Sequence, residues 1–250
     1  MAKGKNIEYR KWEKKNLLLH IIRNDPESSR TSVKRKSRLS MESVLQYINE
    51  LIQEGLIYEA GVMDQTVGRK ATILRINPSG CYFIGVKFNV SAITGVVLDF
   101  EGNVVNQKRI ILPIGINAQE VIELLYACIE DLLESSGDIK NMVRGIGIGV
   151  PGFVDSASGV AVRYVHINDW EMIPLKKLME KRFGIETYIE QSIKVTALAL
   201  KMKPENTNIR DMLYILVGRG VGMVIISNNM ICNGYANGAG EIGHMYVADN

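Results

Sequence analysis

The sequence has few cysteines and no long apolar run. Its three cysteines, Cys81, Cys128 and Cys232, are far apart and form no CxxC pair. An odd number of cysteines without a secretory signal is typical of reduced thiols in the cytosol. The apolar run LLLHII has only six residues, which is too short for a membrane span or for the core of a signal peptide. These absences predict a cytoplasmic protein with no membrane partner.

Acidic residues are scarce relative to basic ones in the first third of the chain. Residues 1–78 carry 15 Lys and Arg against 9 Asp and Glu, a net charge of +6, and no acidic residue occurs from 28 to 41. Residues 79–250 carry 15 against 18, a net charge of −3. Because clustered positive charge attracts polyanions, this distribution predicts a polyanionic partner for the front part alone.

The front part has the pattern of three helices and a hairpin. Apolar residues recur at helical spacing in KKNLLLHIIRND, and a short second helix is predicted near residues 30–37. A third helix begins after Ser40, a good N-cap, and ends at Gly55. Two β-type runs, LIYEAGV and ATILRI, then flank a polar turn. This order is that of a winged helix-turn-helix, which we place in residues 1–76.

A winged helix-turn-helix predicts where DNA is contacted. Its second helix and turn lie against phosphates, and its third helix enters the major groove. A packing module with a solvated basic face is the alternative. The predicted phosphate contacts are Arg30, Lys34, Lys36 and Arg38, the predicted groove-facing residues are Ser40, Met41, Ser43, Gln46 and Tyr47, and the hairpin tip offers Arg69 and Lys70 to a minor groove or a phosphate.

The pattern changes after Cys81. Three β-rich runs, YFIGVKF, ITGVVLDF and NVVNQKRIIL, precede a long amphipathic helix at 117–137 and the buried strand VRGIGIGV. Strand, strand, strand, helix, strand is how the first lobe of an actin-like ATPase begins. The hairpin within DMLYILVGRGVGMVIISNNMICNGY starts a second lobe. We therefore expect an α/β fold with a second domain in residues 77–250.

Two segments carry a specific resemblance. GIGIGVPGFVDSASGVAVRYVHINDWEMIPLKKLMEKRFG and LYILVGRGVGMVIISNNMICNGYANGAGEIGHMYV resemble the ROK family, which groups sugar kinases with transcriptional repressors. ROK repressors place a winged helix ahead of a kinase-like body, so the resemblance extends over the whole chain.

The resemblance also implies which kinase elements are altered. Where a ROK kinase has a DxGxT phosphate loop, this chain has Lys87 for the aspartate and Asn89 and Val90 for the paired glycines. Gln191 and Ser192 replace the Asn-Asp pair that holds the catalytic base, and a serine hydroxyl is no base near neutral pH. Arg219 and Met223 replace small residues of the second phosphate loop. We expect no enzymatic activity.

A sugar-binding site is the remaining expectation. The resemblance implies sugar contacts for Asn168, Glu241 and His244, and Gln191 and Ser192 can bond a hydroxyl without deprotonating it. Paired carboxylate and amide groups suit sugar hydroxyls. The alternative is that Glu241 and His244 only stabilise a tight turn. His166 could also line the cleft.

The end of the sequence departs from the family. In ROK proteins the histidine of GAGEIGH ligates a structural zinc together with three downstream cysteines, and a tetrahedral site needs all four. Cys81, Cys128 and Cys232 all precede His244. We therefore expect no zinc or other cofactor here, and an incomplete second lobe, as in the front part of a longer protein.

Three functional hypotheses follow. The first is a sugar-responsive repressor of carbohydrate-utilisation genes that binds operator DNA as a homodimer, because one small winged helix reads too few base pairs to select an operator. The second is a ROK sugar kinase with a fused DNA-binding domain. The third is a regulator whose effector site has decayed.

Overall fold

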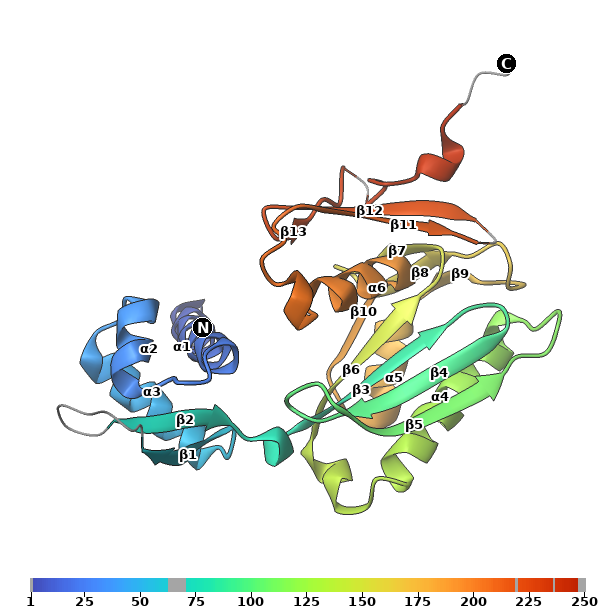
Figure 1. The fold of residues 1–250 in the computed structure, drawn as a ribbon. Coiled ribbons are helices and arrows are strands. Elements are labelled where there is room, and N and C mark those ends of the chain that lie inside the picture. Colours follow the sequence, from blue (N-terminus) through green and yellow to red (C-terminus); the bar gives the residue numbers. More distant parts are fainter. Residues whose placement is uncertain (1, 63–70, 219, 236, 247–250) are drawn as a thin grey trace. The chain divides into compact units, whose positions relative to one another are not determined.

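The computed structural model describes residues 2–62, 71–218, 220–235 and 237–246, and it divides into two compact units. The first unit comprises Met1–Tyr82 with Leu98–Val105, and the second comprises Phe83–Val97 with Asn106–Asn250 (Figure 1). No helix among the described residues is long and apolar enough to cross a membrane.

Three helices open the first unit, and the predicted positions of the second and third are confirmed. They are α1 (Ala2–Asn24), α2 (Arg30–Ser37) and α3 (Met41–Gln53). The Ser29 side chain caps α2 by accepting from the Ser32 amide, and the Ser40 side chain caps α3 by accepting from the Ser43 amide. Gly55 follows α3 with φ 72°, the left-handed conformation expected just past a helix.

An antiparallel hairpin completes this unit. Strand β1 (Ile57–Val62) pairs with β2 (Thr72–Ile76), as the two β-type runs predict. The turn between them, including Arg69 and Lys70, lies outside the described residues. Helices and hairpin share one apolar core formed by Leu18, Ile22, Val33, Val44, Ile48, Leu51, Ile57 and Leu74.

A five-stranded sheet is the base of the second unit. Its strands run in the order β10-β6-β3-β4-β5, with β10 parallel to β6 (Figure 1). Helix α4 packs on β4, because a Cβ at Gly95 would meet Leu132 and Cys128. The bounds are β3 (Tyr82–Phe88), β4 (Ala92–Leu98), β5 (Val104–Ile111), α4 (Ala118–Glu134), β6 (Val143–Val150), α5 (Leu175–Phe183) and β10 (Thr187–Gln191).

Two smaller sheets follow in the same unit. Helix α6 (Ser192–Lys201) packs on the sheet of β11 (Met212–Val217), β12 (Val221–Ser227) and β13 (Met230–Ile231) through Ala197, Val224 and Ile226. The sheet of β7 (Phe153–Asp155), β8 (Val160–Arg163) and β9 (Glu171–Ile173) was not predicted. Its strands are too short to show a two-residue period. Short 3-10 turns lie at Pro78–Gly80, Gly137–Met142, Pro204–Asn206 and Ile242–His244.

A carboxylate on α3 ties α1 to that helix. Glu50 Oε2 lies 2.9 Å from Lys11 Nζ and 2.8 Å from Lys15 Nζ. Hydrogen bonds from Lys15 and then Lys11 lower the pKa of Glu50 to about 2. A carboxyl whose pKa falls on folding stabilises the folded state above its unfolded pKa, and this contribution is lost as the pH falls toward the folded value.

We therefore expect Glu50→Gln to lower the free energy of unfolding at neutral pH by about 1 kcal/mol, as for a good part-exposed ion-pair network. The difference from the wild type should shrink as the pH falls from about 4.5 toward about 2, because the carboxyl protonates first in the unfolded chain and only near pH 2 in the folded one. Denaturant unfolding at a series of pH values measures the difference in the free energy of unfolding, and Glu42→Gln, at an exposed position of the same helix, is the control. A difference that stays constant with pH would contradict the assignment.

Candidate functional site

The described residues carry two candidate surfaces, of which the first is basic. The side chains of Lys34, Arg35 and Arg38 are exposed on α2 and just after it. Arg38 has φ 59° and ends α2 by donating its backbone N–H to the Lys34 carbonyl. No ion pair involves these three side chains within the described part of the chain, so their charges face solvent.

Two other predicted phosphate contacts already have anionic partners. Arg30 Nη1 lies 2.7 Å from Glu59 Oε1, and Lys36 Nζ lies 2.7 Å from Asp25 Oδ2. The hydrogen bond from Lys36 lowers the pKa of Asp25 below its usual value. Because these cations are neutralised within the fold, they offer less charge to a polyanion than Lys34, Arg35 and Arg38.

The exposed face of α3 differs from the prediction at one residue. Met41 and Gln46 are exposed, but Tyr47 is only 8% exposed and belongs to the core with Val44 and Leu51. Tyr47 lies three residues after Val44 and therefore on the same face, so its outward assignment is wrong. The Lys14 ammonium lies 5.8 Å from the centre of its ring.

The polar side chains of α3 make local hydrogen bonds. Gln46 Nε2 donates to Glu50 Oε1 over 3.1 Å, and the half-buried Ser43 is held by the Ser40 hydroxyl at 2.9 Å. Leu45 and Asn49 are exposed on the same outer face and were missed. Counting four and eight residues from Met41 would have found them.

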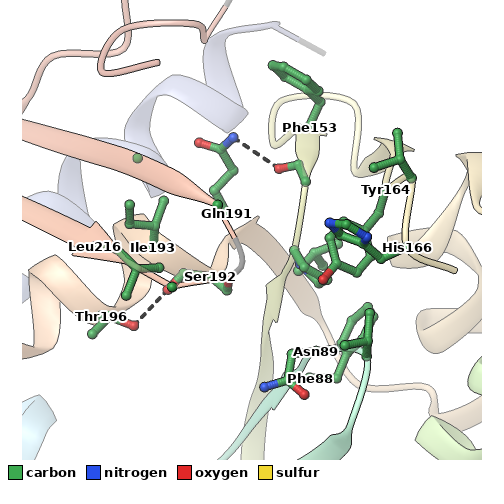
Figure 2. Close-up of a pocket in the computed structure, with 18 of the residues that line it drawn as sticks. Phe88, Asn89, Phe153, Tyr164, His166, Gln191, Ser192, Ile193, Thr196 and Leu216 are labelled. Atoms are coloured by element: carbon green, nitrogen blue, oxygen red, sulfur yellow. Dashed lines mark hydrogen bonds between the residues drawn. The ribbon is translucent and has the colours of Figure 1, made fainter. Parts of the chain in front are cut away.

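The second candidate site is a cavity of about 740 Å³ in the second unit. It lies where β3, β6 and β10 end, since Val150 and Gln191 are register partners at the ends of the parallel strands β6 and β10. Figure 2 shows Gln191, Ser192, Ile193 and Thr196 along one wall, with Phe153, Tyr164 and His166 opposite. Loops at the carboxyl ends of parallel strands commonly hold ligands.

Gln191 and Ser192 both line the cavity, as predicted from sequence. Gln191 is buried, and its Nε2 donates to the Gly152 carbonyl over 3.0 Å (Figure 2). Ser192 begins α6, and its carbonyl accepts from the Thr196 hydroxyl over 2.8 Å. Neither side chain is a carboxylate, so neither can accept a proton from a sugar hydroxyl at neutral pH.

The loop after β3 is filled by its own side chains. Asn89 Oδ1 accepts hydrogen bonds from the Ser91 amide at 2.8 Å and the Ala92 amide at 3.0 Å. Lys87 Nζ donates to Thr196 Oγ1 over 3.1 Å. The Asn89 carboxamide thus bonds backbone N–H groups that a phosphate-binding loop leaves open to its ligand.

Glu241 and His244 reach the cavity from the GAGEIGH segment. The Met223 amide donates to the Gly240 carbonyl over 2.8 Å, which fixes the segment on β12. Gly240 has φ 93°, and a Cβ there would lie 1.8 Å from the Met223 oxygen. Only glycine allows this approach. His244 Nε2 lies 4.0 Å from Glu241 Oε2, and the His244 side chain is 78% exposed.

Asn168 is separate from these residues. It is exposed, does not line the cavity, and donates its side-chain N–H to the Gly115 carbonyl over 3.2 Å. Its neighbour His166 does line the cavity, with its ring 5.3 Å from that of Tyr164. Sequence reasoning missed Phe88, Phe153, Arg163, Tyr164 and Tyr214 in the lining. Phe153, Arg163, Tyr164 and Tyr214 lie within the two segments that resemble the ROK family, but the resemblance assigned them no role.

A tetrahedral zinc does not fit the described residues near His244. No group of three His, Cys, Asp or Glu side chains placed to hold a metal occurs within the described ranges. Cys81 and Cys128 are buried in the fold, and burial raises the pKa of the Cys128 thiol to about 11. Such a thiol is protonated at neutral pH, whereas zinc requires the thiolate.

The fold and the cavity together indicate the class of protein. An α/β body with a parallel β6–β10 pair, a cavity at its strand ends and a glycine-anchored GAGEIGH segment is typical of sugar-kinase-like proteins. The chain belongs to the ROK family, whose model matches residues 83–250.

Similar proteins include both regulators and kinases. The xylose repressor of Caldicellulosiruptor bescii is 30% identical over 93% of this chain and 58% of its own length. A solved ROK family transcriptional regulator, described as a homolog of the E. coli MLC protein, has a TM-score of 0.82 and 23% identity, covering 95% of this chain and 60% of that one. A ROK family glucokinase from Streptomyces griseus, solved with glucose and AMPPNP, has a TM-score of 0.58 and 27% identity over 67% of this chain and 51% of its own. The chain thus spans under two thirds of the length of these relatives.

We expect Gly240→Ala to destabilise the second unit by about 2 kcal/mol or more, because the added Cβ combines a left-handed backbone with a backbone clash. Thermal unfolding measures the change. The control is Gly238→Ala, where a Cβ would meet nothing within 4 Å. Equal midpoints for the two variants would show that the Gly240 contact with Met223 is unimportant.

Proposed function

We propose that the protein is a DNA-binding transcriptional regulator, and that residues 1–76 form a winged helix-turn-helix. The observation that carries the proposal is the solvent-facing cluster Lys34, Arg35 and Arg38 beside the exposed start of α3. Cations on α2 suit phosphates, while Met41 and Gln46 on α3 suit a major groove. The amide of Gln46 can pair with the N6/N7 edge of adenine. The fold shared with a ROK transcriptional regulator over 95% of this chain supports this proposal.

The second domain, residues 77–250, is proposed to bind a sugar effector without phosphorylating it. Aromatic side chains and hydrogen-bonding groups both line the cavity, as a sugar site requires. Glu241 is the one carboxylate among the described lining residues. Lys87 stands where a kinase places a magnesium-organising aspartate, and Ser192 stands where it places a base. Of the sequence-derived contacts, Gln191, Ser192, Glu241 and His244 belong to this proposed site, and Asn168 does not.

The proposed regulatory role is repression by a dimer. The relative named xylose repressor supports repression of carbohydrate-utilisation genes as the proposed role. Two copies of the domain are proposed to read a pseudo-palindromic operator as a homodimer in the cytoplasm, since one copy covers too few base pairs.

A ROK sugar kinase with a fused DNA-binding domain is the second candidate. The likeness to a glucokinase solved with glucose and AMPPNP favours it. An ATP-dependent phosphorylation assay over a panel of pentoses and hexoses separates the two, and turnover of any sugar would refute the regulator-only proposal. The third candidate, a decayed effector site, predicts that no sugar binds.

We expect Lys34→Ala with Arg35→Ala to weaken binding to every DNA sequence and to reduce the salt slope by about 0.9 for each phosphate that the protein no longer neutralises. Lys36→Ala should have a smaller effect, because that ammonium already pairs with Asp25. Fluorescence anisotropy at several salt concentrations measures the slopes. The exposed Lys140→Ala in the other unit is the control, and equal slopes for all variants would exclude α2 from the interface.

We expect a cognate sugar to raise the thermal midpoint of the chain. A ligand that binds only the folded state adds about 2.7 kcal/mol at about 100 times its Kd. Thermal shift over sugars and their derivatives measures this, and Glu241→Gln should reduce the shift because an acceptor of hydroxyl hydrogen bonds is weakened. A panel without any shift would favour the decayed site.

A further inference from the structure

The charge of the cavity lining identifies the class of effector. Of the described lining residues, Lys87 and Arg163 are basic, and Glu241 alone is acidic. His166 and His244 add two further groups that can donate. A neutral sugar needs paired hydroxyl contacts and leaves this excess of positive charge uncompensated.

Lys87 is the central group of this lining. Its ammonium has three N–H donors, and within the described residues one of them bonds Thr196 Oγ1 at 3.1 Å. The hydroxyl of Thr196 in turn donates to the Ser192 carbonyl at 2.8 Å, so the acceptor that orients Lys87 is itself fixed. No carboxylate pairs with Lys87 in the described part of the chain.

The surroundings of Lys87 favour an anion. Gly149, next to the last residue of β6, packs beside the Lys87 stem, since a Cβ there would be in van der Waals contact with Lys87 Cγ at 3.6 Å. Ser192 begins α6 at the same wall, and the N-cap residue of that helix, Gln191, makes no side-chain capping hydrogen bond. A lysine ammonium binds a phosphate or carboxylate as a point charge.

We infer that the effector is an anionic sugar, a sugar phosphate or a sugar acid, whose charged group is bound by Lys87. This inference rests on the proposed sugar-binding function. The Glu241 end of the cavity holds hydroxyls, and the Lys87 end, which in a kinase would receive the transferred phosphoryl group, here holds an anionic substituent of the effector itself.

The test compares sugars that share a ring. Glucose, glucuronate and glucose 6-phosphate form one series, and N-acetylglucosamine with its 6-phosphate forms another; calorimetry with the 250-residue chain gives each Kd. We expect the charged member of one series to bind about tenfold or more tightly than its neutral parent, as one charge-assisted hydrogen bond provides. Whether the phosphate or the carboxylate binds more tightly identifies the source of the charge.

Substitutions assign the preference to Lys87. Lys87→Met should bring the affinity ratio of charged to neutral sugar toward one, Lys87→Arg should retain the ratio, and Lys177→Met, an exposed lysine of α5, should leave it unchanged. The ligand-free thermal midpoints of the variants show whether each is folded. If Lys87→Met is unfolded, the salt dependence of the wild-type affinity ratio decides, since a charge contact weakens with salt.

Two outcomes would overturn the inference, and only the second also contradicts the proposed sugar response. Equal binding of neutral and charged members removes the anion subsite and leaves the sugar-responsive regulator intact. Absence of binding by every member of both series contradicts the inference and the proposed sugar response together, while DNA binding by the same sample would still support the regulator.

Discussion

The parallel pairing of β6 with β10 is the constraint on which the cavity depends. Because Val150 and Gln191 are register partners, the glycine loop that follows β6 and the helix that follows β10 must begin at the same edge of the sheet. Gln191 Nε2 then reaches the Gly152 carbonyl at 3.0 Å. Gly152 has φ 77°, and a Cβ there would lie 2.2 Å from the Arg163 carbonyl. One register therefore places Gln191, Gly152 and the start of α6 together, and a slip by one residue would separate them.

Local patterns were sufficient for most elements. Caps, apolar spacing and a C-terminal glycine predicted α2 and α3 close to their observed bounds, because each signal acts within one turn of the chain. Tyr47 was wrongly predicted to face outward because its hydroxyl is typical of a surface residue. Its ring is apolar enough to be buried, and the side chain is in fact buried. Spacing from Val44 was the better guide than side-chain polarity.

The candidate sites were harder to predict because they depend on contacts distant in sequence. The ion pairs of Arg30 with Glu59 and of Lys36 with Asp25 join residues 29 and 11 positions apart, and no local rule ranks these cations below Lys34. The aromatic residues Phe88, Phe153 and Tyr214 of the lining likewise come from three strands, β3, β7 and β11. The sequence identified Gln191, Ser192, Glu241 and His244, whereas Phe153, Tyr164 and Tyr214 were missed although they lie within the ROK-like segments, because only the fold brings them to one cavity.

The altered kinase positions are compatible with the fold because each new side chain has a bond within it. Asn89 closes its own turn, Gln191 holds the Gly152 carbonyl, and Lys87 bonds Thr196. A polar side chain that is buried without a partner costs about 1–3 kcal/mol, so random decay of a catalytic site would tend to leave such groups behind. Trp170 Nε1 is a buried side-chain atom without a hydrogen-bond partner among the described residues, whereas Glu50 Oε2 lies 2.9 Å and 2.8 Å from the ammonium groups of Lys11 and Lys15. Neither atom lines the cavity. Among the described residues, no buried side-chain atom without a hydrogen-bond partner therefore lies in the cavity lining.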